Sequence, residues 1–204
     1  METLRLSDDA NGIKIAAEII KRGGMVAIPT ETVYGLAASA YDENAVNKIF
    51  VAKGRPQDNP LIVHTCNLDM TRQIVEDFSI DAQKLAKEFW PGPLTIILKR
   101  NEKIPSSVSA GLDTVAVRMP SNEVARKLIE VSGLPLAAPS ANLSGSPSPT
   151  SADHVLKDLD GKIDAVIMSD DCTVGVESTV VTLAVSPYRI LRPGFVTHEE
   201  ISEI

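Results

Sequence analysis

Residues 25–32, Met25-Val26-Ala27-Ile28-Pro29-Thr30-Glu31-Thr32, contain the pattern from which the fold can be predicted. The apolar half, residues 25–28, has the length and composition of a short buried strand. Before it, residues 11–22 carry Ile and Ala at helical spacing and end at two glycines, which indicates a helix. After it the chain becomes polar at once, as at a strand end in an open α/β sheet, where ligand sites tend to lie.

The same alternation of helices and short apolar strands continues along the chain. Helices are expected after Asp42, over residues 80–89, after Ser121 and after Thr150, which begins a Thr-x-x-Asp capping pattern. A last helix is expected after Thr197. Further strands are expected at residues 61–63, 94–98, 114–118, 134–138, 165–168, 179–183 and 188–191. We therefore expect an α/β (α+β) fold in which helices pack on a twisted sheet of parallel and antiparallel strands.

Length and composition describe an ordinary globular protein. The 204 residues fit a single domain, residues 1–204, and 44% of them are apolar. No apolar run is long enough for a membrane span and no signal peptide is visible, so a cytoplasmic protein is expected. The two cysteines lack metal-ligand spacing, and no metal site is expected. A net charge of −7 argues against a surface built broadly for nucleic acid.

Polar segments that follow predicted strands supply the candidate site. In the first, Thr30, Thr32 and Tyr34 alternate, so an extended chain would point three hydroxyls to one side, toward a small polar ligand. A Pro-initiated turn with satisfied hydroxyls explains the pattern equally well. In the second, an extended Lys53-Gly54-Arg55 would place two cations on one side, as a polyphosphate requires. A solvated basic turn is the more common use of such a tripeptide.

Arg118 lies on an otherwise apolar strand, on the side opposite Val115 and Val117, and must meet either a structural carboxylate or an anionic ligand. The acids nearest in sequence are Asp113, on the other strand face, and Glu123, beyond a proline. Neither is an obvious partner, so the α-carboxylate of a substrate is the hypothesis. Other polar residues at predicted strand ends could serve either structure or binding; they are His64, Ser140, Asn142, Ser178 and Arg192.

Four motifs in register resemble one family. P-T-E-T-V-Y-G-L (29–36), K-G-R-P-x-x-N-P-L (53–61), V-R-M-P (117–120) and P-S-A-N-L-S-G (139–145) are similar to those of the YrdC-like threonylcarbamoyl-AMP synthases, here in the short single-domain form. The resemblance implies a YrdC-like fold around a large positive cleft. It also implies formation of threonylcarbamoyl-AMP and pyrophosphate from L-threonine, bicarbonate and ATP. A partner complex would then transfer the threonylcarbamoyl group to the tRNA adenosine next to the anticodon.

The resemblance also implies roles for individual residues. Lys53 and Arg55 are the expected catalytic cations, and Tyr34 is the expected wall of the pocket. Mg²⁺ is expected to arrive with ATP. The residues expected to bind ATP are Lys53, Arg55, Asn59, Thr114, Asn142, Thr150 and Arg192. The residues expected to bind threonine and its carbamate are Thr32, His64, Arg118, Ser140 and Ser178.

Two other functions compete with this one. An RNA-binding module, for double-stranded RNA or weakly bound tRNA, could use the same positive cleft. The net charge and the 4% aromatic content disfavour it, because readers of single-stranded RNA stack bases on aromatic rings. A carbamoyl-transfer domain of the hydrogenase-maturation type shares a similar fold, but such chains carry zinc-finger cysteines that this sequence lacks.

Overall fold

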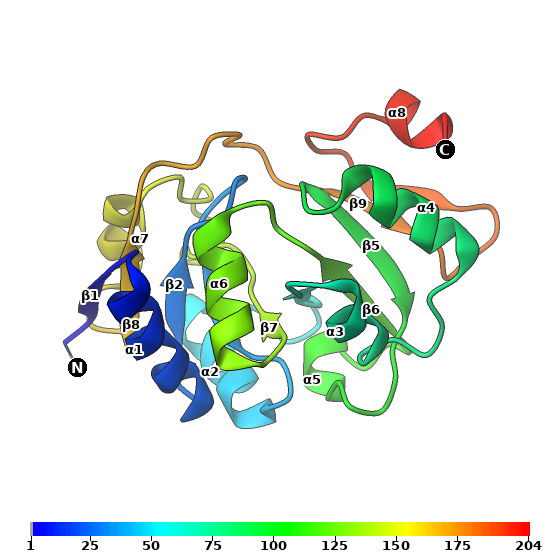
Figure 1. Ribbon diagram of the computed structural model, residues 1–204. Helices are drawn as coiled ribbons and strands as arrows, with labels where there is room; N and C mark the ends of the chain where they lie inside the picture. Colours follow the sequence, from blue (N-terminus) through cyan, green and yellow to red (C-terminus); the bar gives the residue numbers. More distant parts are fainter. Residues whose placement is uncertain (1) are drawn as a thin grey trace.

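The computed structural model describes residues 2–204, and a ten-stranded mixed sheet runs through this part of the chain (Figure 1). Its strand order is β1-β8-β2-β3-β7-β4-β6-β5-β9-β10. The strands are β1 (Leu4–Ser7), β2 (Val26–Ile28), β3 (Gly35–Ser39), β4 (Ile62–His64), β5 (Leu94–Lys99), β6 (Thr114–Arg118), β7 (Leu136–Ala137), β8 (Ala165–Met168), β9 (Thr179–Thr182) and β10 (Arg189–Arg192). The helices are α1 (Ala10–Lys21), α2 (Glu43–Lys53), α3 (Leu68–Arg72), α4 (Ile80–Phe89), α5 (Ser106–Ser109), α6 (Glu123–Ser132), α7 (Ala152–Leu159) and α8 (His198–Ser202).

The mixed sheet expected from the sequence is confirmed. Parallel pairs such as β4 with β6 and β5 with β9 alternate with antiparallel pairs such as β5 with β6 and β9 with β10. The strand expected at residues 134–138 is shorter, Leu136–Ala137. Strands β1 and β3 and the short helices α3 and α5 were not expected.

Helix ends follow the capping residues in most places. The side chain of Asp42 accepts from the N–H groups of Asn44 and Ala45 at the start of α2, and Thr197 and Glu200 form the capping box of α8, both as expected. The cap expected at Thr150 is wrong by one residue. Ser151 caps α7, because the main chain of Thr150 is engaged outside the helix, where its carbonyl oxygen accepts from the N–H of Cys172.

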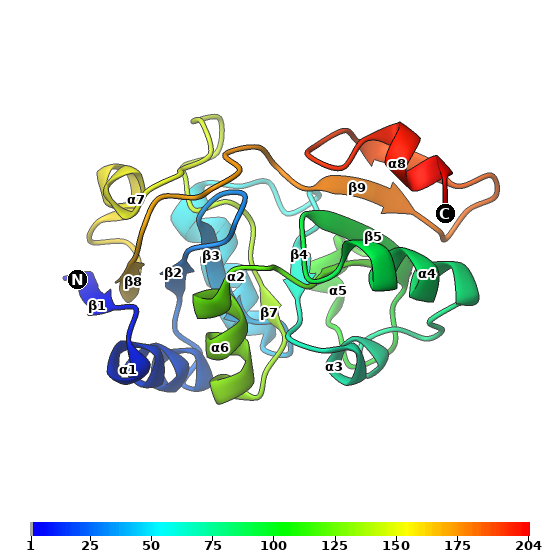
Figure 2. The ribbon, with the colours of Figure 1, turned by 45° about the horizontal axis from the view of Figure 1, so that its top comes forward.

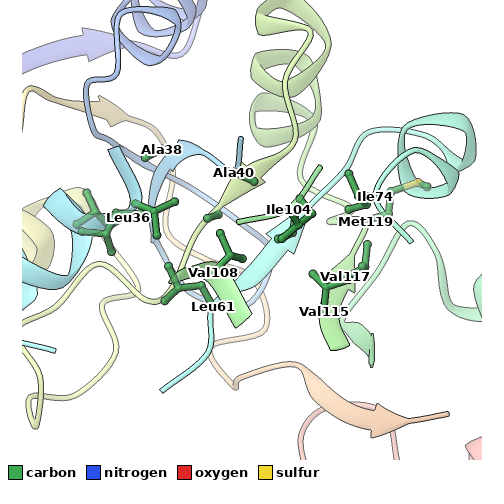
Figure 3. Close-up of a cluster of buried hydrophobic side chains, with 14 of the residues drawn as sticks. Leu36, Ala38, Ala40, Leu61, Ile74, Ile104, Val108, Val115, Val117 and Met119 are labelled. Carbon is green, nitrogen blue, oxygen red and sulfur yellow. The ribbon is translucent and has the colours of Figure 1, made fainter. Parts of the chain in front are cut away.

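Two apolar cores cover the two faces of the sheet. Val26 and Ile28 pack with α1 and α6, whereas Ala27 packs with α2, as the alternation of side chains along a strand requires. Figure 2 shows α1 and α6 side by side below the strands β8 and β2. On β6, Val115 and Val117 point into a cluster with Ile104 and Ile74 (Figure 3). The opposite side of β6, which carries Arg118, is therefore free to face a ligand.

The length and hydropathy of the helices in residues 2–204 exclude one kind of segment. None of them is long and apolar enough to cross a membrane.

Candidate active site

A cleft of about 340 Å³ lies over the β4, β6 and β5 part of the sheet. Ile62 and His64 of β4 pair in register with Ala116 and Arg118 of β6, so these four side chains form its floor. The turn after β2, the segments after β7 and α2, and strands β9 and β10 form its walls. The sequence candidates that line it are Thr32, Arg55, Asn59, His64, Arg118, Ser140, Ser178 and Arg192.

The segment after β2 is a turn and not an extended chain. The Thr30 hydroxyl donates to the carbonyl oxygen of Val33 at 2.6 Å and accepts from the N–H groups of Thr32 and Val33. The turn leaves Thr30 and Thr32 on the cleft but sends Tyr34 into the core, where its hydroxyl donates to the carbonyl oxygen of Ser169. The alternative of a turn with satisfied hydroxyls is therefore confirmed for this segment, and Tyr34 lies outside the lining of this cleft. Burial raises the pKa of Tyr34 to about 12.

Arg118 has a carboxylate partner that the sequence reasoning did not consider. Its Nη2 lies 2.8 Å from Oε1 of Glu31, and both side chains are buried. Its Nη1 donates to the Thr32 hydroxyl at 2.9 Å and its Nε to the carbonyl oxygen of Gly92 at 3.3 Å. Of the two partners that the sequence left open, a structural carboxylate is therefore present: the β2–β3 turn brings Glu31 to Arg118, with which neither Asp113 nor Glu123 pairs. Arg118 nevertheless borders the cleft, and Glu31 does not.

His64 lies beside Arg118 on the cleft floor. It is 3% exposed, and among residues 2–204 its Nδ1 has no hydrogen-bond partner. Burial, followed by the positive charge of Arg118, lowers the pKa of His64 to about 3. The imidazole is therefore neutral at physiological pH, with one nitrogen able to donate and the other to accept.

Lys53 and Arg55 do not lie on one extended segment. Lys53 ends α2, and Gly54 turns the chain in the left-handed conformation with φ of 59°. The Lys53 ammonium is buried and donates to the carbonyl oxygens of Ser140 and Asn142, each at 2.5 Å, instead of lining the cleft. The prediction that residues 53–55 form an extended segment is therefore wrong. Burial, together with nearby Arg55, lowers the pKa of Lys53 to about 8.

Three other candidates for ATP binding also lie outside the cleft lining. The amide nitrogen of Asn142 donates to the carbonyl oxygens of Leu143 and Ser146, at 2.8 and 2.7 Å, and so shapes its own loop. Thr114 begins β6 and Arg118 ends it, so the two residues lie on the same face of the strand but at its opposite ends. Thr150 precedes α7.

Arg192 and Ser178 form a pair at the opposite wall. The Arg192 guanidinium donates to the carbonyl oxygen and the hydroxyl of Ser178 and lies 3.2 Å from the carboxylate of Glu177. The Ser178 hydroxyl is also 2.8 Å from that of Thr95. A Cβ on Gly194 would lie 2.5 Å from the main-chain nitrogen of Thr179, so only glycine permits this close approach. Sequence reasoning missed Glu31, Glu177 and Thr95.

The cationic side chains of the cleft lie at two depths, so one anion could bind at the floor and another at the walls. Within residues 2–204 its lining carries three guanidinium groups, those of Arg55, Arg118 and Arg192, and one carboxylate, that of Glu177. Arg118 is at the floor and nearly inaccessible, whereas the Arg192 side chain is 39% exposed. Apolar side chains make up much of the remaining lining, and the largest of them are Ile62, Ile97, Leu112, Val180 and Leu191. Across the same residues, no group of three or more His, Cys, Asp or Glu is placed to hold a metal ion.

The class defined so far is an α/β protein with a mixed sheet and a cleft on one face whose guanidinium groups could pair with an anionic small molecule. Comparison with known proteins specifies the class further. Residues 18–194 match the Sua5/YciO/YrdC sequence family, described as "Telomere recombination". The chain belongs to this family.

Three relatives illustrate the similarity. The threonylcarbamoyl-AMP synthase of Pyrococcus abyssi is 54% identical over 192 residues, which are 94% of this chain and 56% of that protein. The putative threonylcarbamoyl-AMP synthase of Mycobacterium tuberculosis is 34% identical over 195 residues, 96% of this chain and 89% of that one. The crystal structure of P. abyssi Sua5 complexed with L-threonine superposes with a TM-score of 0.95 at 52% identity and covers 99% of this chain and 59% of that one. The chain thus spans a little over half of the length of its P. abyssi relative.

Proposed function

We propose that the chain catalyses the formation of L-threonylcarbamoyl-AMP, pyrophosphate and water from L-threonine, bicarbonate and ATP. The observation that carries the proposal is the separation of the guanidinium groups, with Arg118 at the cleft floor and Arg55 and Arg192 at the walls. One carboxylate and one triphosphate can then bind in the same cleft without competing for one cation. The similarity to threonylcarbamoyl-AMP synthases, and to a Sua5 bound to L-threonine, supports the same reaction.

Threonine is assigned to the floor. The α-carboxylate pairs with Arg118, and the neutral His64 and the hydroxyls of Thr32, Ser140 and Ser178 surround the rest of the amino acid. A guanidinium fits a carboxylate through two parallel hydrogen bonds, which a single ammonium cannot supply.

ATP is assigned to the walls. Arg55 and Arg192 bind the triphosphate, Asn59 borders it, and the apolar side chains Leu112 and Leu191 offer a surface for the base. Lys53 and Asn142 act indirectly by holding the segment that presents Ser140. Thr114 and Thr150 have no contact with ATP in this assignment, because they lie outside the cleft.

The reaction needs no protein nucleophile. The threonine amine attacks the carbon of bicarbonate, or of the CO₂ formed from it, and gives a carbamate. A carbamate oxygen then attacks the α-phosphate of ATP, and pyrophosphate leaves. The task of the protein is to position the two substrates and to offset the charge that develops on the phosphate, a role that we assign to Arg55 of the cleft wall.

The proposal also covers the metal that accompanies ATP and the later use of the product. Mg²⁺ enters as part of the ATP substrate, and the threonylcarbamoyl group passes to tRNA through a separate transferase complex in the cytoplasm. One sheet runs through residues 2–204, and we treat them as one domain. An RNA-binding module gains no support from the cleft, whose described lining contains no Phe, Tyr or Trp on which a base could stack.

The test is pyrophosphate release from Mg-ATP, measured with each substrate omitted in turn. Release is expected only when threonine and bicarbonate are both present. Release that continues unchanged without threonine would show a different reaction. Salt-sensitive binding of tRNA in a filter assay, without any turnover of ATP, would favour the RNA-binding alternative.

A further inference from the structure

The carboxylate of Glu31 lies behind the guanidinium of Arg118 as seen from the cleft. Arg118 borders the cleft and Glu31 does not, and the exposed fractions of the two side chains are 4% and 7%. Among residues 2–204, the polar contact of the Glu31 carboxylate is the 2.8 Å ion pair between its Oε1 and Nη2 of Arg118, and its Oε2 has no partner. A buried carboxylate with a single partner acts on its surroundings chiefly through its charge.

That charge changes what Arg118 can bind. An isolated guanidinium at the floor of a cleft attracts any anion, including a phosphate of ATP or a simple carboxylic acid. Here Glu31 cancels the positive charge, and the adjacent His64 adds none because it is neutral. Bringing a lone carboxylate to this neutral pair leaves one uncompensated negative charge in a place screened from water. An amino acid brings its own ammonium group, and the sum of charges remains zero.

We propose that Glu31 is a specificity-determining residue that makes the cleft floor selective for zwitterionic amino acids over simple anions. Glu31 acts on the substrate only through Arg118 and does not touch it, so it is a positioning residue and not a catalytic one. Arg118 keeps hydrogen-bonding capacity for the substrate, because Nη2 carries two N–H groups and Glu31 is its one polar partner in the described part of the chain. The inference rests on the proposed function, since it assumes that threonine occupies the floor.

The experiment compares two ligands that differ only in the ammonium group. L-Threonine and (R)-3-hydroxybutyrate share the carboxylate, the hydroxyl and the methyl group. Their affinities are measured by calorimetry for the wild-type chain and for Glu31→Gln, which keeps the shape of the side chain and removes its charge. Glu130→Gln serves as the matched control, because Glu130 pairs with Lys127 on the exposed face of α6.

In the wild type, threonine is expected to bind at least about 100-fold more tightly than hydroxybutyrate. In Glu31→Gln this ratio is expected to fall by at least about tenfold, mainly because hydroxybutyrate binds better, while Glu130→Gln keeps the wild-type ratio. A purely structural role of Glu31 would weaken both ligands together and leave the ratio unchanged. An unchanged ratio in folded Glu31→Gln overturns the proposal.

The wild-type measurement tests the proposal even without the variant. If Glu31→Gln does not fold, binding of hydroxybutyrate to the wild type within tenfold of threonine still overturns the proposal. The failure of the proposed function looks different. In that case the wild type binds no threonine at all, whereas here threonine binds and only the selectivity fails.

Discussion

Lys53, the last residue of α2, is bonded through its buried ammonium group to the main-chain carbonyl oxygen of Ser140 at the wall of the cleft. The Lys53 side chain thus adds to the main-chain hydrogen bonds that hold the segment after β7, such as the bridge between Gly35 and Ser140. A residue that resembles a phosphate ligand in the sequence is, in the folded chain, part of the support of the site.

Replacing Lys53 with Met should therefore destabilise the protein. The carbonyl oxygens of Ser140 and Asn142 lose a buried donor, and the free energy of unfolding should fall by about 1–3 kcal/mol. Urea unfolding measures the change, with Lys14→Met on the exposed face of α1 as the control. Equal stability of Lys53→Met and the wild type would mean that the ammonium is not needed to hold the segment.

His64 should make the protein acid-sensitive. Its folded pKa of about 3 lies below the ordinary 6.5, so between these values the unfolded chain binds a proton that the folded chain does not. Stability is therefore lost as the pH falls through this window, by about 2 kcal/mol between pH 7 and pH 5 from this group. Urea unfolding at the two pH values should show that His64→Gln loses less than the wild type. The exposed His154→Gln is the control, and an equal loss in all three proteins would contradict the assignment.

Arg118→Lys should weaken threonine binding selectively. Lysine preserves a positive charge for Glu31 but cannot offer a paired fork to the substrate carboxylate. The loss of one charge-assisted pair corresponds to about 1.5–3 kcal/mol, or about 10- to 150-fold in the threonine KM. The ATP KM should change little, because Arg55 and Arg192 remain in place. Steady-state kinetics decide the matter, with Arg189→Lys on the exposed edge strand as the control. A normal threonine KM would leave Arg118 a structural ion-pair residue only.

Gly194→Ala should disturb the wall formed by Ser178 and Arg192. The added methyl group meets the main chain of residues 177–179, which has no flexible side chain to give way. We expect a loss of about 1–3 kcal/mol in stability and a raised ATP KM. The neighbouring Phe195→Ala is the control, since Phe195 is 56% exposed. If both variants behave alike, the close approach at residue 194 has no role in the site.

The sequence predicted which residues are near the cleft better than it predicted what they touch. Residues at predicted strand ends, such as His64 and Arg118, do meet on one floor, because β4 and β6 are parallel neighbours. The partner of Arg118 could not be predicted, since Glu31 reaches it only through a turn closed by the Thr30 hydroxyl. The same turn places Tyr34 in the core, so its hydroxyl does not share a side with those of Thr30 and Thr32 as an extended segment would require.

Prediction of the fold from the sequence pattern was limited in the same way. Apolar runs predicted most strands, but β3, Gly35-Leu36-Ala37-Ala38-Ser39, was missed because it has no β-branched residue. Small residues suit this position, since β3 is buried on both faces. Strand order was beyond the reach of the pattern, because the pairing of β5 with β9 joins segments far apart in the chain.

The position of β9 and β10 has a consequence for synthesis on the ribosome. β8 and β9 are successive strands, yet β8 lies next to β1 near one edge of the sheet and β9 pairs with β5 near the other (Figure 1). Until residues 179–192 emerge, β5 remains an unpaired edge, and the cleft lacks the wall that carries Ser178 and Arg192. A nascent chain thus completes the strands of the cleft floor, β4 and β6, before the wall that carries Ser178 and Arg192. The complete cleft therefore forms only after residue 192 has left the ribosome.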